Sequence, residues 1–247
     1  MRTLTLLLLA LFPAGCSKSR QSSDRNTAEA AKRLKHIGLA MHAYNATAGA
    51  FPAGLYTTDN RVGLSWRVQI LPYVEQAALF QQFKLDEPWD SAHNKQLIPM
   101  MPAVFATPGV DVPTGHTFVR GFATPEGSPV AFFPGPLELK STLARQPGTP
   151  VPGRRITTVT DGTSNSIMLA EAAEAVPWTK PEALECHPSN PLSLLGPVRG
   201  GFLALMGDGA VRLFPEGLSH ASLRLAITIN DGNPLPAEIN APVWNAR

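Results

Sequence analysis

The chain has 247 residues, of which 44% are hydrophobic, and its net charge at pH 7 is only +2. This apolar content is enough for a core in one or two domains, whereas the 24 prolines and 20 glycines predict many loops. The small positive charge, without a cluster of Lys and Arg, argues against nucleic acid as a partner.

The first residues have the layout of an export signal. An apolar run from Leu4 to Phe12 follows one Arg and leads through small residues to Cys16. The run is too short to span a bilayer but has the proportions of a secretory signal. A cysteine directly after small residues resembles the signal of bacterial lipoproteins, although Pro13 stands where such signals usually have Leu. We expect residues 1–15 to be removed and Cys16 to be lipidated; the alternative is an ordinary cleaved signal with a leftover Cys.

Lipidation would fix both the location and the cysteine chemistry of the protein. Each buried CH₂ contributes about 0.8 kcal/mol, so several acyl chains anchor a protein permanently. We expect an exported, membrane-anchored envelope protein facing the periplasm or the outside, with residues 16–26 as a polar tether. Cys186 would then lack a partner within the chain. With His187 it resembles a Cys/His nucleophile, but neighbours on a Pro-rich loop rarely form one, so we expect a plain semi-buried thiol.

A long helix is predicted directly after the tether. Asn26 and Glu29 have the spacing of a capping box. Behind them, apolar residues recur at spacings of three and four, which predicts one buried stripe on a helix over about 27–48; they are Ala30, Leu34, Ile37, Met41, Tyr44 and Ala48. Gly and Pro in "AGAFPAG" end this helix.

The middle of the chain is predicted to be less regular. Leu64 to Ile70 suits a strand or a first helical turn, Pro72 leads into a helix, and another short helix starts near Ser91. Residues 106–155 are dense in Pro, Gly and Thr, which indicates a loop-rich insertion with strand candidates in "TFVRGFA" and "VAFFPG".

The last third is predicted to form strands joined by tight turns. Strands are expected at Ile156 to Val159 and at Ser166 to Ala170. "FLALM" and "AVRLF" flank an Asp-Gly turn and predict a hairpin, and "SHASLRLAITIN" predicts a helix with apolar positions facing inward. The order favours an α+β domain over 27–235, with the N-terminal helix packed on an antiparallel sheet and a tail over 236–247.

The segment "KLDEPWDSAHNKQ" concentrates polar chemistry. Asp86, Asp90 and His93 offer oxygen and nitrogen ligands for a cation. A structural account competes with this: Asp90 or Ser91 caps a helix, Trp89 plugs the core, and His93 and Asn94 bond to loop carbonyls. We favour the structural account. In "TDGTSN" we likewise prefer a turn with side-chain-to-backbone bonds over a cation site.

Two sets of aromatic side chains are candidates for contacts. Trp66, Trp89 and Trp178 could line a groove as stacking platforms for a ligand. Aromatic residues of the 106–155 segment are candidates for contact with a partner, although core packing explains them equally well; they are Phe118, Phe122, Phe132 and Phe133. Ser164 and Ser166 lack a Gly-x-Ser-x-Gly context, and no phosphate loop, HExxH or CxxC is present. We therefore expect no enzyme activity and no cofactor.

Six ordered segments carry a family resemblance: "LKHIGLAMHAYNATAGAFPAG", "LSWRVQILPYVEQAALFQQF", "EPWDSAHN", "TDGTSNSIMLAE", "VPWTKPEAL" and "GDGAVRLF". Together they resemble the domain of unknown function 1559 family, also filed as a bacterial solute-binding-like family. The resemblance implies a pilin-like, or pseudopilin, arrangement and an envelope location, and it implies no reaction.

The chain departs from the family pattern in three places. The family's N-terminal pilin segment is missing and the lipoprotein-type signal replaces it, so the resemblance does not imply polymerisation into a pilus. Thr107-Pro108-Gly109 stands where Cys-Pro-Ser is common, and 198–201 reads Val-Arg-Gly-Gly instead of a His-Gly-Gly element. We therefore expect a structural or protein-interaction module that contacts another envelope protein or a surface polymer; the alternative is a solute- or glycan-binding lipoprotein.

Overall fold

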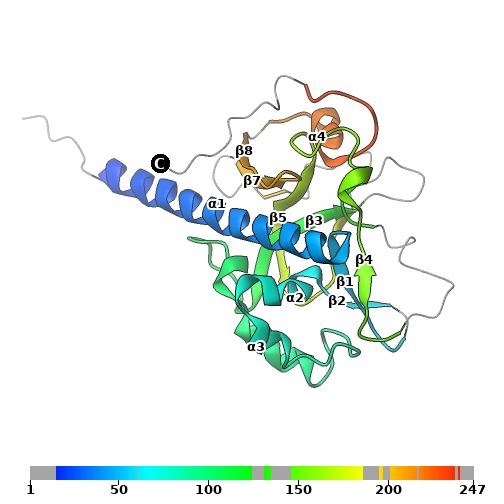
Figure 1. Ribbon diagram of the computed structural model, residues 1–247. Coiled ribbons are helices and arrows are strands. Elements are labelled where there is room, and N and C mark those ends of the chain that lie inside the picture. Colours follow the sequence, from blue (N-terminus) through cyan, green and yellow to red (C-terminus); the bar gives the residue numbers. More distant parts are fainter. Residues whose placement is uncertain are drawn as a thin grey trace, which may run out of the picture.

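The computed structural model describes residues 15–59, 61–123, 131–134, 146–185, 195–196, 201–215, 217–236 and 239, with backbone alone for 15–20 and 152. One long helix, α1 (Gly15–Ala48), lies against a body of two sheets and short helices (Figure 1). The larger sheet has the strand order β6-β3-β5-β7-β8, and the smaller has the order β2-β1-β4. An α+β fold with an N-terminal helix on a sheet is therefore confirmed.

The larger sheet is built from segments far apart in the sequence. Its strands are β3 (His116–Ala123), β5 (Ile167–Pro177), β6 (Leu184–Glu185), β7 (Gly201–Met206) and β8 (Val211–Pro215). All neighbouring pairs are antiparallel except β3 and the short edge strand β6, which are parallel. The smaller sheet pairs β1 (Pro52–Tyr56) with β2 (Val62–Leu64) and β4 (Pro150–Pro152).

The predicted apolar stripe of α1 is confirmed as the buried face of the helix. Leu34, Ile37 and Met41 are at most 2% exposed and belong to the core shared with β7 and β8. Ala48, predicted at the end of the stripe, is exposed. The helix begins at Gly15 rather than near residue 27, so residues 16–26, which we expected to form a tether, are helical. Among the described residues, no helix combines the length and apolarity needed to cross a bilayer.

Strand β7 shows why the larger sheet needs cover on both faces. All six of its residues are buried. Leu203 and Leu205 belong to the cluster beneath α1, while Phe202, Ala204 and Met206 belong to the cluster on the opposite face. Side chains of a strand alternate between faces, so a continuous apolar run implies packing on both sides. The helix α4 (His220–Ile227) covers the second face, and its Leu223, Ala226 and Ile227 point into that cluster as predicted.

The predicted hairpin is confirmed as the pair β7 and β8. Phe202 pairs with Phe214, and Leu205 pairs with Val211. Gly209 has a φ of +85°, a conformation that favours glycine, and the Asp208 carboxylate accepts a hydrogen bond from the N–H of Ala210 at 2.8 Å.

Two other predictions differ from the structure. The strand expected at Ile156 to Val159 is a 3-10 turn, η4 (Ile156–Thr158). β-branched residues favour strands only where a neighbouring strand is available, and here the residues of η4 are exposed. Within the predicted insertion 106–155, β3 is an interior strand of the larger sheet, paired with β5 and β6.

Short helices form the lower lobe in Figure 1, between β2 and β3 in the chain. They are α2 (Trp66–Gln69), η1 (Leu71–Val74), α3 (Ala77–Phe80), η2 (Asn94–Met100) and η3 (Ala103–Phe105). Of the two predicted alternatives, strand or helical turn, Trp66 to Gln69 form the helical turn, with Ser65 as N-cap. Helices η1 and η3 both contact α1, which places two remote segments beside it.

Candidate functional site

The segment 84–96 is a loop tied together by one side chain. Asn94 is fully buried, and its amide nitrogen donates to the carbonyl oxygens of Lys84 at 2.9 Å, Glu87 at 3.0 Å and Pro88 at 3.1 Å. Its amide oxygen accepts from the N–H of Lys84 at 3.0 Å. The hydroxyl of Ser91 accepts from the N–H of Asn94 at 3.1 Å. These bonds confirm that Asn94 bonds to loop carbonyls, whereas the predicted helix cap by Asp90 or Ser91 is wrong, because η2 has His93 as its N-cap and no side-chain cap bond.

The cation candidates of the same loop do not converge. Asp86 and Asp90 are exposed, and Nε2 of His93 lies 2.7 Å from the carbonyl oxygen of Gln82, where its N–H donates. In the described part of the chain, no three His, Cys, Asp or Glu side chains gather closely enough to hold a metal ion. Bonds from Lys84 and Ser91 hold the pKa of Glu87 below its usual value. Glu87 is therefore paired with Lys84 within the loop, at 2.9 Å.

The three tryptophans do not form an open groove. Trp178 is fully buried and Trp66 is 5% exposed, so the prediction that they are accessible stacking platforms is wrong. Both pack on Phe105, with ring centroids 5.8 Å and 6.2 Å from it. Trp89 is half-buried and packs against the same core, with Nζ of Lys180 5.9 Å from its ring centroid. Aromatic area here stabilises the core.

The phenylalanines of the 106–155 segment are mostly core residues as well. Phe122, Phe132 and Phe133 are at most 5% exposed, so they are unavailable as contact residues, and only Phe118 is half-buried. Phe133 lies over Gly121 of β3, where a Cβ would come within 2.2 Å of its ring. The core-packing alternative therefore holds for these three residues.

The "TDGTSN" segment is a turn, as preferred from the sequence. The carboxylate of Asp161 accepts from the N–H groups of Asp231 at 2.7 Å and Gly232 at 2.9 Å. The amide of Asn165 donates to the carbonyl oxygen of Asp161 at 2.9 Å. Asp161 thus fastens the segment after α4 to the strand region before β5.

A groove beside α1 is a feature that the sequence did not reveal. It has a volume of about 490 Å³. One wall is formed by α1 residues spaced three and four apart: Glu29, Lys32, Arg33, Lys35, His36 and Leu39. The opposite wall comes from Val74 and Gln76 at the end of η1 and from residues 102–104 around η3. Its rim is basic and its opposite wall is largely apolar.

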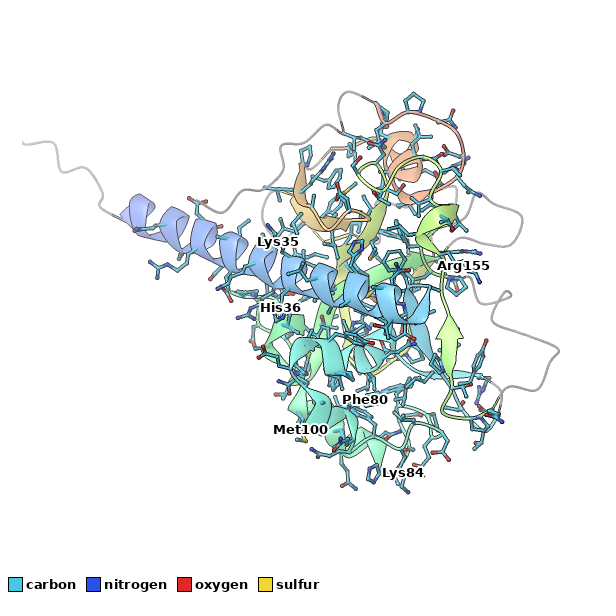
Figure 2. All side chains as sticks on the ribbon, in the orientation of Figure 1. Lys35, His36, Phe80, Lys84, Met100 and Arg155 are labelled. Carbon is cyan, nitrogen blue, oxygen red and sulfur yellow. The ribbon has the colours of Figure 1, made fainter. Side chains whose placement is uncertain are left out.

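Arg33 closes the floor of this groove. Its Nε donates to Glu29 at 3.0 Å, and its Nη1 donates to the carbonyl oxygen of Ala106 at 3.2 Å. Lys32, Lys35 and His36 remain exposed, and Leu39 is 65% exposed. Figure 2 labels Lys35 and His36 on α1. The sequence shows that these α1 residues lie off the buried stripe. It does not show the groove, because the second wall comes from residues about forty and seventy positions later in the chain.

Several sequence predictions concern residues outside the part of the chain that the structure describes. The signal segment 1–14, Cys186, His187 and most of the tail 236–247 lie outside the described residues, and Cys16 is described only as part of the α1 backbone.

The fold and the groove define a class: an α+β protein in which a long N-terminal helix lies on a largely antiparallel sheet and carries an exposed basic groove. Residues 27–192 match the family described as a protein of unknown function (DUF1559). The chain belongs to this DUF1559 family. Neither a curated protein nor a solved structure matches it.

Proposed function

We propose that this chain is a non-enzymatic, lipid-anchored protein of the cell envelope with a pseudopilin-like fold, and that it serves as an interaction module. Residues 1–15 would be removed on export, and Cys16 would carry the acyl chains. The body would then be presented to other envelope components by α1.

The observation that carries this proposal is the projection of α1. The N-terminal part of the helix extends past the body (Figure 1), and residues 21–25 are exposed. With 34 residues and about 1.5 Å per residue, α1 is about 50 Å long. An exposed helix that starts beside the candidate lipidated cysteine suits a spacer between a membrane and a folded body.

The burial of the aromatic candidates supports an interaction module over a solute-binding protein. Trp66 and Trp178 offer no open aromatic face, whereas the basic groove beside α1 is exposed. Protein interfaces typically bury an apolar centre surrounded by a polar rim, and this groove has both an apolar wall and a polar rim.

The test is whether Cys16 is lipidated in the mature protein. The full chain is expressed in a bacterium that processes lipoproteins, and the mature N-terminus is examined by mass spectrometry. We expect the mature chain to begin with a diacylglyceryl cysteine at Cys16. Cys16→Ser should shift the protein from the membrane fraction to the soluble fraction. Because Ser17 is also small and polar, Ser17→Ala serves as the matched control and should stay membrane-bound. Recovery of unprocessed wild-type chain from the cytosol would overturn the proposal.

A further inference from the structure

We propose that the groove beside α1 is the docking site of this module and that its occupant is an acidic segment of a partner protein carrying at least one apolar side chain. The inference rests on the proposed function and names the site and the chemistry of the partner.

The dimensions of the groove suit a short peptide segment. Its α1 wall runs from Glu29 to Leu39, which corresponds to about 15 Å along the helix axis. Extended chain rises about 3.3 Å per residue, so a few residues of a partner fill this length. The volume of about 490 Å³ accommodates side chains of that segment.

The charge on the rim selects an acidic occupant. Glu29 is paired with Arg33, so its charge is offset within the wall. Among the described residues, no carboxylate forms an ion pair with Lys32 or Lys35. Two adjacent turns of α1 thus present uncompensated positive charge, which attracts and orients carboxylates of a partner.

The apolar part of the groove selects a side chain that buries hydrocarbon. Leu39 is 65% exposed, yet it borders Val74 and Val104 across the groove. A Leu or Phe of the partner placed between these residues would remove apolar surface of both proteins from water. Charge sets the orientation, and this anchor holds the segment in place.

The position along α1 favours a protein over the membrane surface as the occupant. Lys32 lies sixteen residues after Cys16, about 24 Å along the helix. Charge is screened within about 8 Å at physiological ionic strength. With α1 standing on the membrane, lipid headgroups would exert little attraction on this groove.

The experiment uses the full mature chain purified in a neutral detergent. The probes are a short fluorescent peptide of Glu, Asp and Leu and the same peptide with each acid replaced by its amide. We expect the acidic peptide to bind and the amide peptide to bind at least about tenfold more weakly. The double substitution Lys32→Glu with Lys35→Glu should weaken the acidic peptide by at least about tenfold. Leu39→Ala should weaken both peptides.

The matched control changes the net charge equally at a distance. Lys95→Glu with Arg155→Glu reverses two exposed cations outside the groove, and Figure 2 shows Arg155 far from Lys35. This control should bind as the wild type does, and all variants should keep the wild-type melting temperature because the altered side chains are exposed.

Three results would overturn the docking proposal. The first is that the acidic peptide does not bind at millimolar concentration. The second is that the groove variant and the control variant bind it equally well. The third is that the Cys16→Ser chain binds vesicles containing anionic lipid and that this binding is lost in the groove variant but kept in the control. Membrane attachment through Cys16 is measured separately, so failure of the groove leaves the proposed anchoring intact and failure of anchoring leaves the groove testable.

Discussion

The amide of Asn94 contacts the backbone of three residues in the 84–96 loop. Backbone groups of this loop lack the hydrogen-bond partners that a regular helix or strand would supply. The amide of Asn94 supplies those partners instead. A buried amide suits this task, since it both donates and accepts. A carboxylate at the same position would only accept and could not bond to the three carbonyls.

Asn94→Ala is expected to destabilise the protein. It leaves the carbonyls of Lys84, Glu87 and Pro88 without this donor, and a buried unsatisfied group costs about 1–3 kcal/mol. We expect a total loss of about 2–4 kcal/mol by urea unfolding, because more than one group is affected. Asp86→Ala and Asp90→Ala at exposed positions should change stability by less than about 0.5 kcal/mol.

The same variants distinguish the hydrogen-bonded loop from a cation site. Added Ca²⁺ or Mn²⁺ should leave the melting temperature of the wild type unchanged, because a ligand raises stability only by binding the folded state. A cation-dependent rise that Asp90→Ala abolishes would contradict this account.

At the scale of elements, the contact between α1 and β7 depends on a missing side chain. A Cβ on Gly38 would lie 2.8 Å from Cδ1 of Leu205 and 3.6 Å from Cα of Gly209. Glycine therefore lets the helix approach the hairpin closely. The cost of glycine within a helix, about 1 kcal/mol, is offset by this packing.

Substitutions at Gly38 should report this close approach. Gly38→Ala gains helix propensity and meets only the flexible end of Leu205, so we expect a change within about 1 kcal/mol. Gly38→Leu should destabilise by about 1–3 kcal/mol because it forces α1 away from β7. The measurement is the unfolding free energy, with Ala46→Leu at an exposed position of the same helix as control. Equal stabilities for both leucine variants would show that α1 does not pack this tightly.

The whole molecule is connected through the short helix α2. The guanidinium of Arg67 donates to the carbonyl oxygen of Val119 in β3, at 3.1 Å from Nε, and its Nη1 donates to Ser65 Oγ at 2.8 Å. Gln69 accepts from the N–H of Gly54 in β1 at 2.9 Å and donates to the hydroxyl of Tyr44 in α1. Two neighbouring side chains of one helical turn thus join α1 and both sheets.

Arg67 is a charged group within the core, fully buried. Burial lowers its pKa to about 9, with the charge of Arg120 acting in the same direction and Glu182 opposing it. At neutral pH the guanidinium is still protonated. The Trp66 ring, 4.7 Å from its Cζ, and the surrounding oxygen acceptors compensate part of the lost hydration.

Arg67→Ala should therefore destabilise the whole fold and not one sheet. We expect a loss of about 3–5 kcal/mol, since the substitution leaves buried acceptors unpaired and opens a cavity. Arg67→Met fills most of the cavity and should lose less. Calorimetry is expected to show one transition at a lower temperature, whereas Arg224→Ala at an exposed position of α4 should match the wild type. Two separate transitions in the wild type would contradict a single connected body.

How far the sequence predicts this protein depends on the range of the interactions. The stripe of α1, the β7 and β8 hairpin, the α4 face and the bonds around Asn94 arise within short stretches, so their patterns are visible residue by residue. The resemblance that pointed to the DUF1559 family likewise rests on local blocks. Lipidation of Cys16 stays a prediction.

By itself, the sequence determined the α+β class, the buried helix stripe and the tight turns, because periodicity and turn chemistry act over a few residues. Only the tertiary structure decided that β3 is an interior strand, that Trp66 and Trp178 pack on Phe105, and that α1 forms a groove with η1 and η3. Each of these depends on pairing between segments tens of residues apart, for which neither partner carries a local signal.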